Sequence, residues 1–459
     1  ALGSSSDIAP RVCISHRSLC VLWYLAGIGS AAVARGGHHR MTALLILLLA
    51  LVLLLLRQSL FVILGSVTAA AYFSVGEEGF SNLVLDSWGA LNREVLLAIP
   101  LYILAGNIMA RGAMAGRLVG LMEAATGHLR GGLGIATVLS CAAFAAVTGS
   151  GTVTLLAVGA VMYPALLKAG YPKALALGLL CAAGTLGIVI PPSIPLILYG
   201  VMTQTSIADL FIAGIGPALL LTGLMLVYVR LSGRRLPVQS FDAPSLRAGL
   251  RSGALGLLMP VIILGGIYTG YFTPTESAAV AVVYALLVEL CVYREMTLKG
   301  LLDTVSETGA LLGGLFPVLL MAVSFTVFLT YQQVPEQVVG FLAGLISSQA
   351  GFLVATNLLL LLVGCVMDIG SAILILAPIL QPVAASHGID PVHFGVMMVV
   401  NLEIGYLTPP LGLNIIVAMG AFREDFWTVC KAMLPFVLLM LAGLMVIAWW
   451  PALSLFLLD

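Results

Sequence analysis

The sequence predicts an all-α polytopic membrane protein built from two repeats, each with a re-entrant helical hairpin and a broken helix. Three observations predict this class. The 459 residues are 61% hydrophobic and 9% charged, against about 25% charged in soluble domains. Apolar stretches near the roughly 20 residues that cross a bilayer recur from Met41 onward. Prolines in the two halves of the chain coincide at a fixed spacing, which predicts the repeats.

Composition also excludes several functions. The formal net charge is +0, so no nucleic-acid partner is expected, and membrane lipid is the expected surrounding. The seven cysteines are scattered without metal-ligand spacing, which is typical of small apolar residues in helices. No metalloprotease motif or phosphate-binding loop is present, so we expect no enzyme and no cofactor.

Residues 1–40 differ from the rest of the chain. They contain four Arg, one Asp and no Met, whereas Met41 opens a long apolar run. We interpret them as an N-terminal extension outside the core, with Met41 as the natural start. A signal peptide is the alternative, because Ala31-Ala32-Val33-Ala34 resembles a cleavage region.

The core is expected to have a first half at 41–229, a basic loop at 230–252 and a second half at 253–459. The loop carries five arginines against a single Asp242, so the positive-inside rule places it in the cytoplasm. Candidate spans lie near 41–56, 60–75, 95–111, 174–200, 205–229, 253–272, 276–292, 308–330, 393–418 and 433–457.

Two apolar stretches, 133–167 and 352–383, are too long for one helix and too short for two full spans. A polar segment interrupts each of them, Thr148-Gly149-Ser150-Gly151-Thr152 in the first and Asp368-Ile369-Gly370-Ser371 in the second. They are typical of re-entrant hairpins whose tips stop inside the membrane. Exposed backbone at that depth is tolerated only where protein buries it or where it lines a wet cavity. The tips therefore indicate a binding site.

A constant shift in residue number relates the two halves. It places four of the six prolines in 164–217 on prolines: Pro164 on Pro382, Pro191-Pro192 on Pro409-Pro410, and Pro217 on Pro435. Chance placement gives roughly 0.3 matches. The repeated unit is a hairpin, a broken helix and a further helix. Such paired interruptions are typical of the substrate site of a secondary transporter.

The broken helices are expected at 174–200 and 393–418, each interrupted by two adjacent prolines. Two prolines remove two backbone donors and disfavour helix just before them. The freed carbonyls and nearby Thr and Asn oxygens are suitable ligands for a hard cation such as sodium. The alternative is a pair of structural kinks.

Few polar side chains interrupt the apolar segments. Among them, Asp368 has the highest free-energy cost of burial in the membrane, and a carboxylate at that depth indicates function. It would stabilise the second tip, complete a sodium site or carry a proton, and we favour the first two roles. Glu403 is similarly placed, with a vestibule at one membrane face as its expected surroundings. Asn107 is expected to form a hydrogen bond between helices.

No lysine or arginine stands where it would obviously bind a carboxylate inside the membrane, since Lys168, Lys173, Arg93 and Arg111 lie at turns or span ends. An anionic substrate would depend on bound cations, helix N-termini and hydroxyls. Sodium coupling is physically sensible in such a site, because the ion supplies the positive charge that the protein lacks.

Several motifs together resemble the large membrane subunit of tripartite ATP-independent periplasmic (TRAP) transporters. The motifs occur in the family's order between about Met41 and Trp450: Thr148-Gly149-Ser150, Gly184-Thr185-Leu186-Gly187-Ile188, Pro191-Pro192-Ser193-Ile194-Pro195-Leu196, Phe272-Thr273-Pro274-Thr275-Glu276-Ser277-Ala278-Ala279, Gly388-Ile389-Asp390-Pro391-Val392-His393-Phe394-Gly395 and Thr408-Pro409-Pro410-Leu411-Gly412-Leu413-Asn414.

The resemblance implies an elevator-type transporter whose moving domain consists of two inverted repeats. It implies sodium-driven uptake of a small carboxylate across the bacterial inner membrane, delivered by a periplasmic substrate-binding protein. It also implies a separate small membrane subunit of about four helices. Apart from the sodium ions that drive coupling, no cofactor is implied.

Carried onto this sequence, the resemblance and the motifs predict a substrate and ion site. Its residues are Gly149, Ser150, Thr152, Gly187, Pro191, Pro192, Asp368, Gly370, Ser371, Asn401, Thr408, Pro409, Pro410 and Asn414. Sodium is expected near Ser150, Thr152, Gly187, Asp368, Gly370 and Thr408.

The sequence departs from the family pattern at two places. Arg57-Gln58-Ser59 stands where a Gly-x-Pro-like turn is usual, and Gly151 stands where another serine is common, so one hydroxyl ligand is absent. The alternative function is a stand-alone ion-coupled organic anion transporter that needs no binding protein. A channel is a further class, but nothing in the sequence resembles a selectivity filter.

Overall fold

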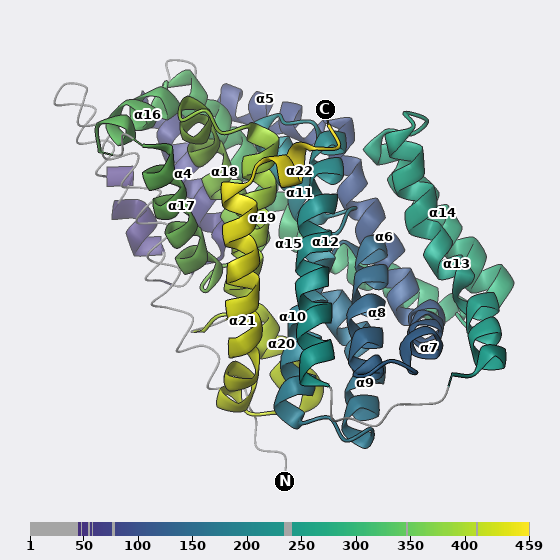
Figure 1. Ribbon diagram of the computed structural model, residues 1–459. Helices are drawn as coiled ribbons and strands as arrows, with labels where there is room; N and C mark the ends of the chain where they lie inside the picture. The colour runs from purple at the N-terminus through teal and green to yellow at the C-terminus, as the bar shows by residue number, and fades with distance from the viewer. Residues whose placement is uncertain are drawn as a thin grey trace, which may run out of the picture.

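The computed structural model describes residues 45–46, 48–53, 56, 58–75, 79–233, 241–345, 348–409 and 412–458. The N-terminal extension at 1–40 therefore lies outside the described residues. In chain order the helices are α4 (Leu60–Val75), α5 (Gly79–Leu91), η2 (Glu94–Leu97), α6 (Ala98–Arg111), α7 (Met114–Thr126), α8 (Gly132–Thr148), α9 (Gly151–Lys168), α10 (Lys173–Val189), α11 (Ile194–Thr203), α12 (Ile207–Ser232), α13 (Ala243–Tyr268), α14 (Pro274–Leu286), η3 (Leu287–Tyr293), α15 (Leu298–Tyr331), α16 (Val334–Leu345), α17 (Gln349–Gly364), α18 (Ile369–Ser386), α19 (Pro391–Tyr406), α20 (Leu413–Phe422), α21 (Phe426–Trp449) and α22 (Ala452–Leu455) (Figure 1).

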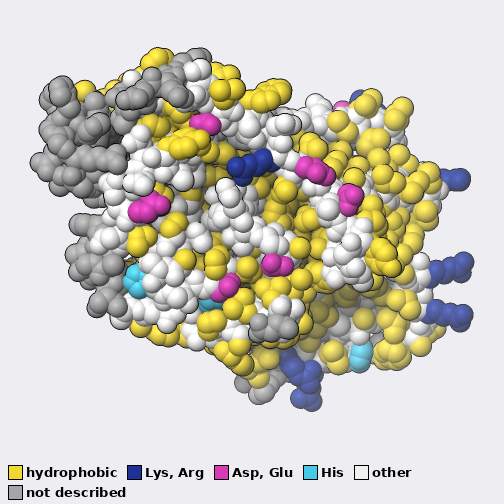
Figure 2. Space-filling view, turned by 90° about the horizontal axis from the view of Figure 1, so that it is seen from above, with side chains coloured by type: hydrophobic (Ala, Val, Ile, Leu, Met, Phe, Trp, Pro, Cys, Tyr) yellow, Lys and Arg dark blue, Asp and Glu magenta, His cyan; other side chains and the backbone are white. Residues whose placement is uncertain are grey.

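The helices confirm the all-α membrane class. In the part of the chain that the structure describes, nine helical segments are long and apolar enough to cross a membrane. Many of their side chains face outward: Leu219 is 65% exposed, Val261 64% and Leu434 59%. Lipid tails are the environment that such outward-facing side chains suit. Figure 2 looks onto one end of the molecule, down the long helices, and there too charged side chains are few.

The helix bounds follow the repeat. The shift that carries Pro164 to Pro382 carries the bounds of α9 to 369–386, which are the bounds of α18. The same shift carries α10 to 391–407, against α19 at Pro391–Tyr406, and carries α12 to 425–450, against α21 at Phe426–Trp449. The prolines that reveal the repeat in the sequence therefore mark equivalent points of two equivalent folding units.

The two repeats are inverted. Between the end of α12 and the start of α17 lie three segments that are long and apolar enough to cross a membrane: α13, α14 with η3, and α15. Because three is odd, the second hairpin enters from the opposite face to the first. In Figure 1, α8 and α9 lie in the lower half of the molecule, whereas α17 and α18 lie in the upper half.

The loop expected at 230–252 is wrong in its extent. Helix α12 continues to Ser232 and α13 already begins at Ala243, so Arg247 and Arg251 are helical. The start has a local cause, because Pro244 occupies the first turn of α13, where the fixed φ of proline suits a helix and its missing N–H is not needed.

A buried glutamate holds the start of α7, the helix that connects α6 to the first hairpin. Glu289 lies on η3, and its two carboxylate oxygens accept hydrogen bonds from the backbone N–H groups of Ala113 and Met114, both at 3.0 Å. These N–H groups belong to the first turn of α7, where a helix offers no internal acceptor. One side chain from a distant span thus caps the connecting helix.

We expect Glu289→Ala to destabilise the protein by about 1–3 kcal/mol, because two buried N–H groups lose their acceptor. Thermal unfolding of the purified chain in detergent measures the loss as a lower Tm. Glu295→Ala is the matched control, since the Glu295 side chain is 56% exposed in its ion pair with Arg117, and such pairs contribute about 0–1 kcal/mol. Equal shifts in the two variants would contradict the capping role.

Candidate binding site between the hairpin tips

The first hairpin turns at Gly149 and Ser150. Gly149 ends α8 in the left-handed conformation at φ 58°, whereas Ser150 is extended. Glycine suits both demands of this turn: it adopts positive φ without strain, and a Cβ here would lie 2.6 Å from the carbonyl oxygen of Pro192. The first tip therefore rests directly on the first helix break.

Hydroxyl groups organise the backbone of this tip. The Thr154 hydroxyl donates to the Ser150 carbonyl at 2.9 Å, and the Thr148 and Thr154 hydroxyl oxygens are 2.9 Å apart. The Ser150 side chain caps no backbone N–H of α9. Its hydroxyl is thus not used to cap α9, and Ser150 lines the cavity described below.

The first break lies between α10 and α11. Below the tip, Gly187 allows close packing, since a Cβ there would lie 2.7 Å from the Ser150 carbonyl oxygen. The Ser193 hydroxyl donates to the Ile188 carbonyl and accepts from the Leu196 N–H at 3.4 Å. Ser193, which the site prediction omits, thereby satisfies backbone groups on both sides of the prolines.

The second tip is capped by Asp368. Its Oδ2 accepts a hydrogen bond from the Ser371 N–H at 2.8 Å, so the carboxylate forms the N-cap of α18. The Ile369 N–H donates to the Tyr406 hydroxyl at 2.7 Å. Asp368 is the equivalent, in the second repeat, of Ser150, the N-cap residue of α9. The geometry shows the first of the three roles considered for Asp368, stabilisation of the tip.

The second break contacts the first hairpin. Asn414, at the start of α20, is fully buried, and its Oδ1 lies 3.5 Å from the Thr152 hydroxyl oxygen. The Thr408 hydroxyl donates a hydrogen bond to the Ile404 carbonyl at 2.8 Å. Pro409 is exposed. Pro410 lies outside the described residues. The Thr152–Asn414 contact brings together residues from both repeats.

Between the tips lies a cavity of about 470 Å³. Five predicted site residues line it, namely Gly149, Ser150, Thr152, Asp368 and Gly370. Gly187, Pro192 and Asn414 contact these residues from behind or at the side, whereas Pro191 lies near Gly214 of α12. Ser371 lines an adjoining cavity of about 520 Å³ that shares Asp368 and Leu315 with the first. Most of the predicted set therefore converges on one region.

Two buried polar residues of α19 do not join this region. Asn401 donates from Nδ2 to the Asn357 carbonyl at 2.9 Å and to the Asn357 Oδ1 at 2.7 Å. It ties α19 to α17 and lines neither cavity. Glu403 is completely buried, so the expected vestibule is wrong, and its carboxylate oxygens have no hydrogen-bond partner among the described residues.

Part of the wall comes from helices that the site prediction omits. Ile103, Gly106 and Asn107 of α6 line the cavity, as do Leu311 and Leu315 of α15. A Cβ on Gly106 would lie 2.8 Å from the Thr148 Cα, so α6 touches the first tip. Tyr406 also lines the cavity. Its position close to the break at Pro409 is the sequence feature that could have predicted its place in the site. The apolar wall residues carry no signal of their own.

The cavity contains no basic side chain among its described lining residues. The cations near the span ends have other partners: Lys173 Nζ lies 2.6 Å from Glu424 Oε2, Arg111 pairs with Glu307, and Arg93 donates to the Val201 carbonyl at 3.4 Å. An anion in this cavity would therefore meet hydroxyls, backbone groups and the Asp368 carboxylate, but no positively charged side chain among the described lining residues.

Paired hairpins and broken helices around a common cavity define a multi-pass membrane transport protein, and sequence comparison narrows the class. The family Tripartite ATP-independent periplasmic transporter, DctM component, matches residues 47–453, and the chain belongs to this family. Its members are transporter permease subunits of the inner membrane, which are not enzymes.

Individual relatives agree with this assignment. The chain is 41% identical over 395 residues to the C4-dicarboxylate TRAP transporter large permease protein DctM of Pseudomonas aeruginosa, covering 85% of this chain and 92% of that protein. It is 37% identical over 398 residues to the isethionate TRAP transporter permease protein DctMQ of Oleidesulfovibrio alaskensis, covering 86% of this chain and 62% of that protein.

Two solved structures share the fold. The Alcanivorax borkumensis YdaH transporter matches with a TM-score of 0.58 at 21% identity, over 81% of this chain and 88% of that chain. Neisseria gonorrhoeae MtrF matches with a TM-score of 0.61 at 13% identity, over 82% and 85%. At these identities the likeness concerns the architecture alone.

Proposed function

We propose that this chain is the permease of a sodium-coupled secondary transporter that imports a small carboxylate delivered by a periplasmic binding protein. The observation that carries the proposal is the cavity between the hairpin tips, which both repeats build and which has hydroxyls and a carboxylate but no described basic residue. A bound anion there needs a cation, and sodium is a hard ion that prefers such oxygen ligands.

Sodium would bind where oxygen atoms gather at the tips and breaks. Around the first tip these are the Ser150 and Thr152 hydroxyls and the carbonyls near Gly187, and around the second they are Asp368, Gly370 and Thr408. The substrate carboxylate would lie between the tips and face the N-terminus of α9, which has no side-chain cap. At α18, Asp368 and Tyr406 already bind two backbone N–H groups. Sodium and the N-terminus of α9 together would supply the positive potential.

The names of the relatives indicate only a broad class of substrate. One is named for C4-dicarboxylates and another for isethionate, so we propose a small organic acid, with a C4-dicarboxylate as the first to test. The family name describes a tripartite system, and one relative is the DctMQ protein. We accordingly propose a small membrane subunit and a periplasmic binding protein as partners.

We further propose an elevator-type movement. The two inverted repeats would move as one unit, because Thr152 and Asn414 contact each other across them. The helices outside the repeats, including α6 and α15, would form the scaffold. Gly106 would let the first tip pass close to α6, since it leaves room for the Thr148 backbone.

Thermal unfolding in sodium chloride and in potassium chloride of equal ionic strength tests the coupling ion. We expect a higher Tm in sodium for the wild-type chain, because a ligand present at ten times its Kd and bound only by the folded state adds about 1.4 kcal/mol. Ser150→Ala is expected to reduce the difference. Equal curves for the wild-type chain would contradict sodium binding.

Uptake by proteoliposomes tests the partner requirement. A sodium gradient should drive carboxylate uptake only when a cognate periplasmic binding protein is added on the outside. Uptake of equal rate without any binding protein would instead favour the stand-alone organic anion transporter.

A further inference from the structure

Asn107 differs from the other polar side chains that line the main cavity. Those side chains, such as Ser150, Thr152 and Asp368, belong to the two repeats, whereas Asn107 lies on α6, before the first repeat begins. Helix α6 packs against α14 and α15, which also lie outside the repeats. Asn107 is thus the one polar side chain that the described scaffold presents to the cavity.

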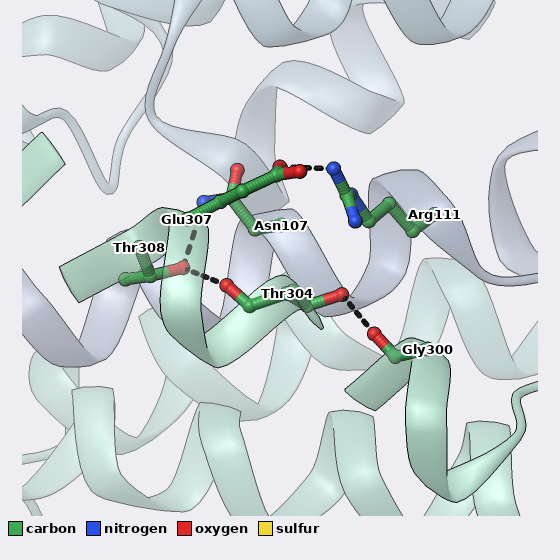
Figure 3. A network of polar contacts seen from close by, with 6 residues as sticks. All are labelled: Asn107, Arg111, Gly300, Thr304, Glu307 and Thr308. Carbon is green, nitrogen blue, oxygen red and sulfur yellow. Dashed lines mark hydrogen bonds and ion pairs between the residues drawn. The ribbon is translucent and has the colours of Figure 1, made fainter. Parts of the chain in front are cut away.

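The Asn107 amide is held by a second scaffold helix. Its Nδ2 donates to the Thr308 hydroxyl oxygen at 3.0 Å, and that hydroxyl donates to the Thr304 carbonyl of its own helix at 2.8 Å (Figure 3). Thr308 is almost fully buried, with 3% of its surface exposed. Both side chains of the nearby Arg111–Glu307 ion pair are about half-exposed, so this pair contributes little to stability.

The hydrogen-bond chain fixes which end of the amide faces away from Thr308. A threonine hydroxyl has one proton, and Thr308 commits it to the Thr304 carbonyl. The hydroxyl oxygen can then only accept, so the group opposite it must be the amide N–H. Figure 3 shows the Asn107 oxygen pointing away from Thr308. This Oδ1 has no hydrogen-bond partner among the described residues.

We propose that Asn107 is a specificity residue whose Oδ1 accepts a hydrogen bond from a hydroxyl group of the transported acid. This inference rests on the proposed function and names a feature of the substrate. A carbonyl oxygen cannot pair with a carboxylate, because both are acceptors. It favours an acid that carries a donor, and a hydroxyl is the donor that adds no charge to a cavity already holding Asp368.

The scaffold position of Asn107 gives this contact a second consequence. Gly106, its neighbour, touches the Thr148 backbone of the first tip. In an elevator movement the tips would leave α6, and the Asn107 contact would be lost together with the tip contact. Asn107 would therefore select hydroxylated acids in the state seen here and not after the movement.

The test compares acids that differ only by a hydroxyl. Isothermal titration calorimetry of the full chain in sodium chloride measures Kd for malate and succinate, and for lactate and propionate. One hydrogen bond corresponds to roughly 2- to 10-fold in affinity. We expect the wild-type chain to prefer the hydroxylated member of a pair by this factor and Asn107→Leu to bind both members alike.

Thr308→Val is the matched variant, since it releases the amide without removing it. We expect it to retain part of the preference, because the freed amide no longer keeps its oxygen toward the ligand. A purely structural role for Asn107 would instead weaken both members of a pair equally in both variants, and this result would overturn the inference. A full preference retained by Asn107→Leu would overturn it as well.

The result also separates this inference from the proposed function. Binding of both members of a pair with equal affinity by the wild-type chain contradicts the role of Asn107 but leaves carboxylate transport standing. Binding of none of the four acids contradicts the proposed substrate class, and the inference fails with it.

Discussion

Replacement of Gly405 by valine is expected to prevent the second hairpin from packing on its broken helix. A Cβ at residue 405 would overlap the Cα and carbonyl carbon of Gly364 and would lie 2.8 Å from the Cys365 nitrogen. All three are backbone atoms, so no side-chain rotation relieves the overlap. Gly187, the equivalent residue of the first repeat, also packs against hairpin backbone, since a Cβ there would lie 2.7 Å from the Ser150 carbonyl oxygen. We expect a loss above about 4 kcal/mol, at the extreme of single substitutions.

Gel filtration and thermal unfolding in detergent measure this effect. Gly420→Ala is the matched control, because nothing lies within 4 Å of a Cβ at residue 420 on α20. There the substitution should be neutral or stabilise by about 0.5–1 kcal/mol, since alanine is the better helix former. A Gly405→Val chain that elutes and melts like wild type would show that the two helix backbones do not meet at this point.

Asp368→Asn is expected to abolish the sodium-dependent rise in Tm and sodium-driven uptake while leaving the fold intact. Asparagine caps helices about as well as aspartate, so the hydrogen bond from the Ser371 N–H to residue 368 can persist. What the substitution removes is the negative charge that would hold a cation next to the cavity. The variant thus separates the capping role, which the geometry shows, from the proposed ion role.

Asp368→Ala supplies the comparison, since it removes the cap as well as the charge. We expect its Tm in potassium chloride to fall by the equivalent of about 1 kcal/mol, whereas Asp368→Asn stays near wild type there. The same uptake assay and the same two salts are used throughout. If Asp368→Asn responds to sodium as the wild-type chain does, Asp368 is a structural cap and belongs to no sodium site.

The local sequence predicts much of the site because backbone chemistry at the tips and breaks leaves a local trace. Gly149 adopts the positive φ at which α8 ends, and Asp368 caps the first turn of α18. Pro191-Pro192 follows directly after the point at which α10 stops. The constant spacing of the repeat also identifies Ser150 and Asp368 as equivalent positions, although the two side chains differ. Apart from that spacing, each of these features depends on residues close together in the chain.

Asn401 and Glu403 show where local reasoning fails. Both lie on α19 shortly before the break, yet Asn401 binds Asn357 of α17 and Glu403 is enclosed without a hydrogen bond to any described residue. A helix that is apolar on all sides offers no polar face from which to read its orientation. Only packing against its neighbours decides which of its few polar residues meets the cavity.

The sequence by itself therefore determined the membrane class, the two repeats and the turns at which their helices stop, because hydrophobicity, glycine and proline act within a few residues. The tertiary structure alone decided which of these elements meet. It brought Thr152 to Asn414 from the other repeat and placed Asn107 and Leu315 of the outer helices in the cavity wall. Such contacts depend on how whole helices pack, and a helix that is apolar on all sides does not reveal which neighbour each of its faces will meet.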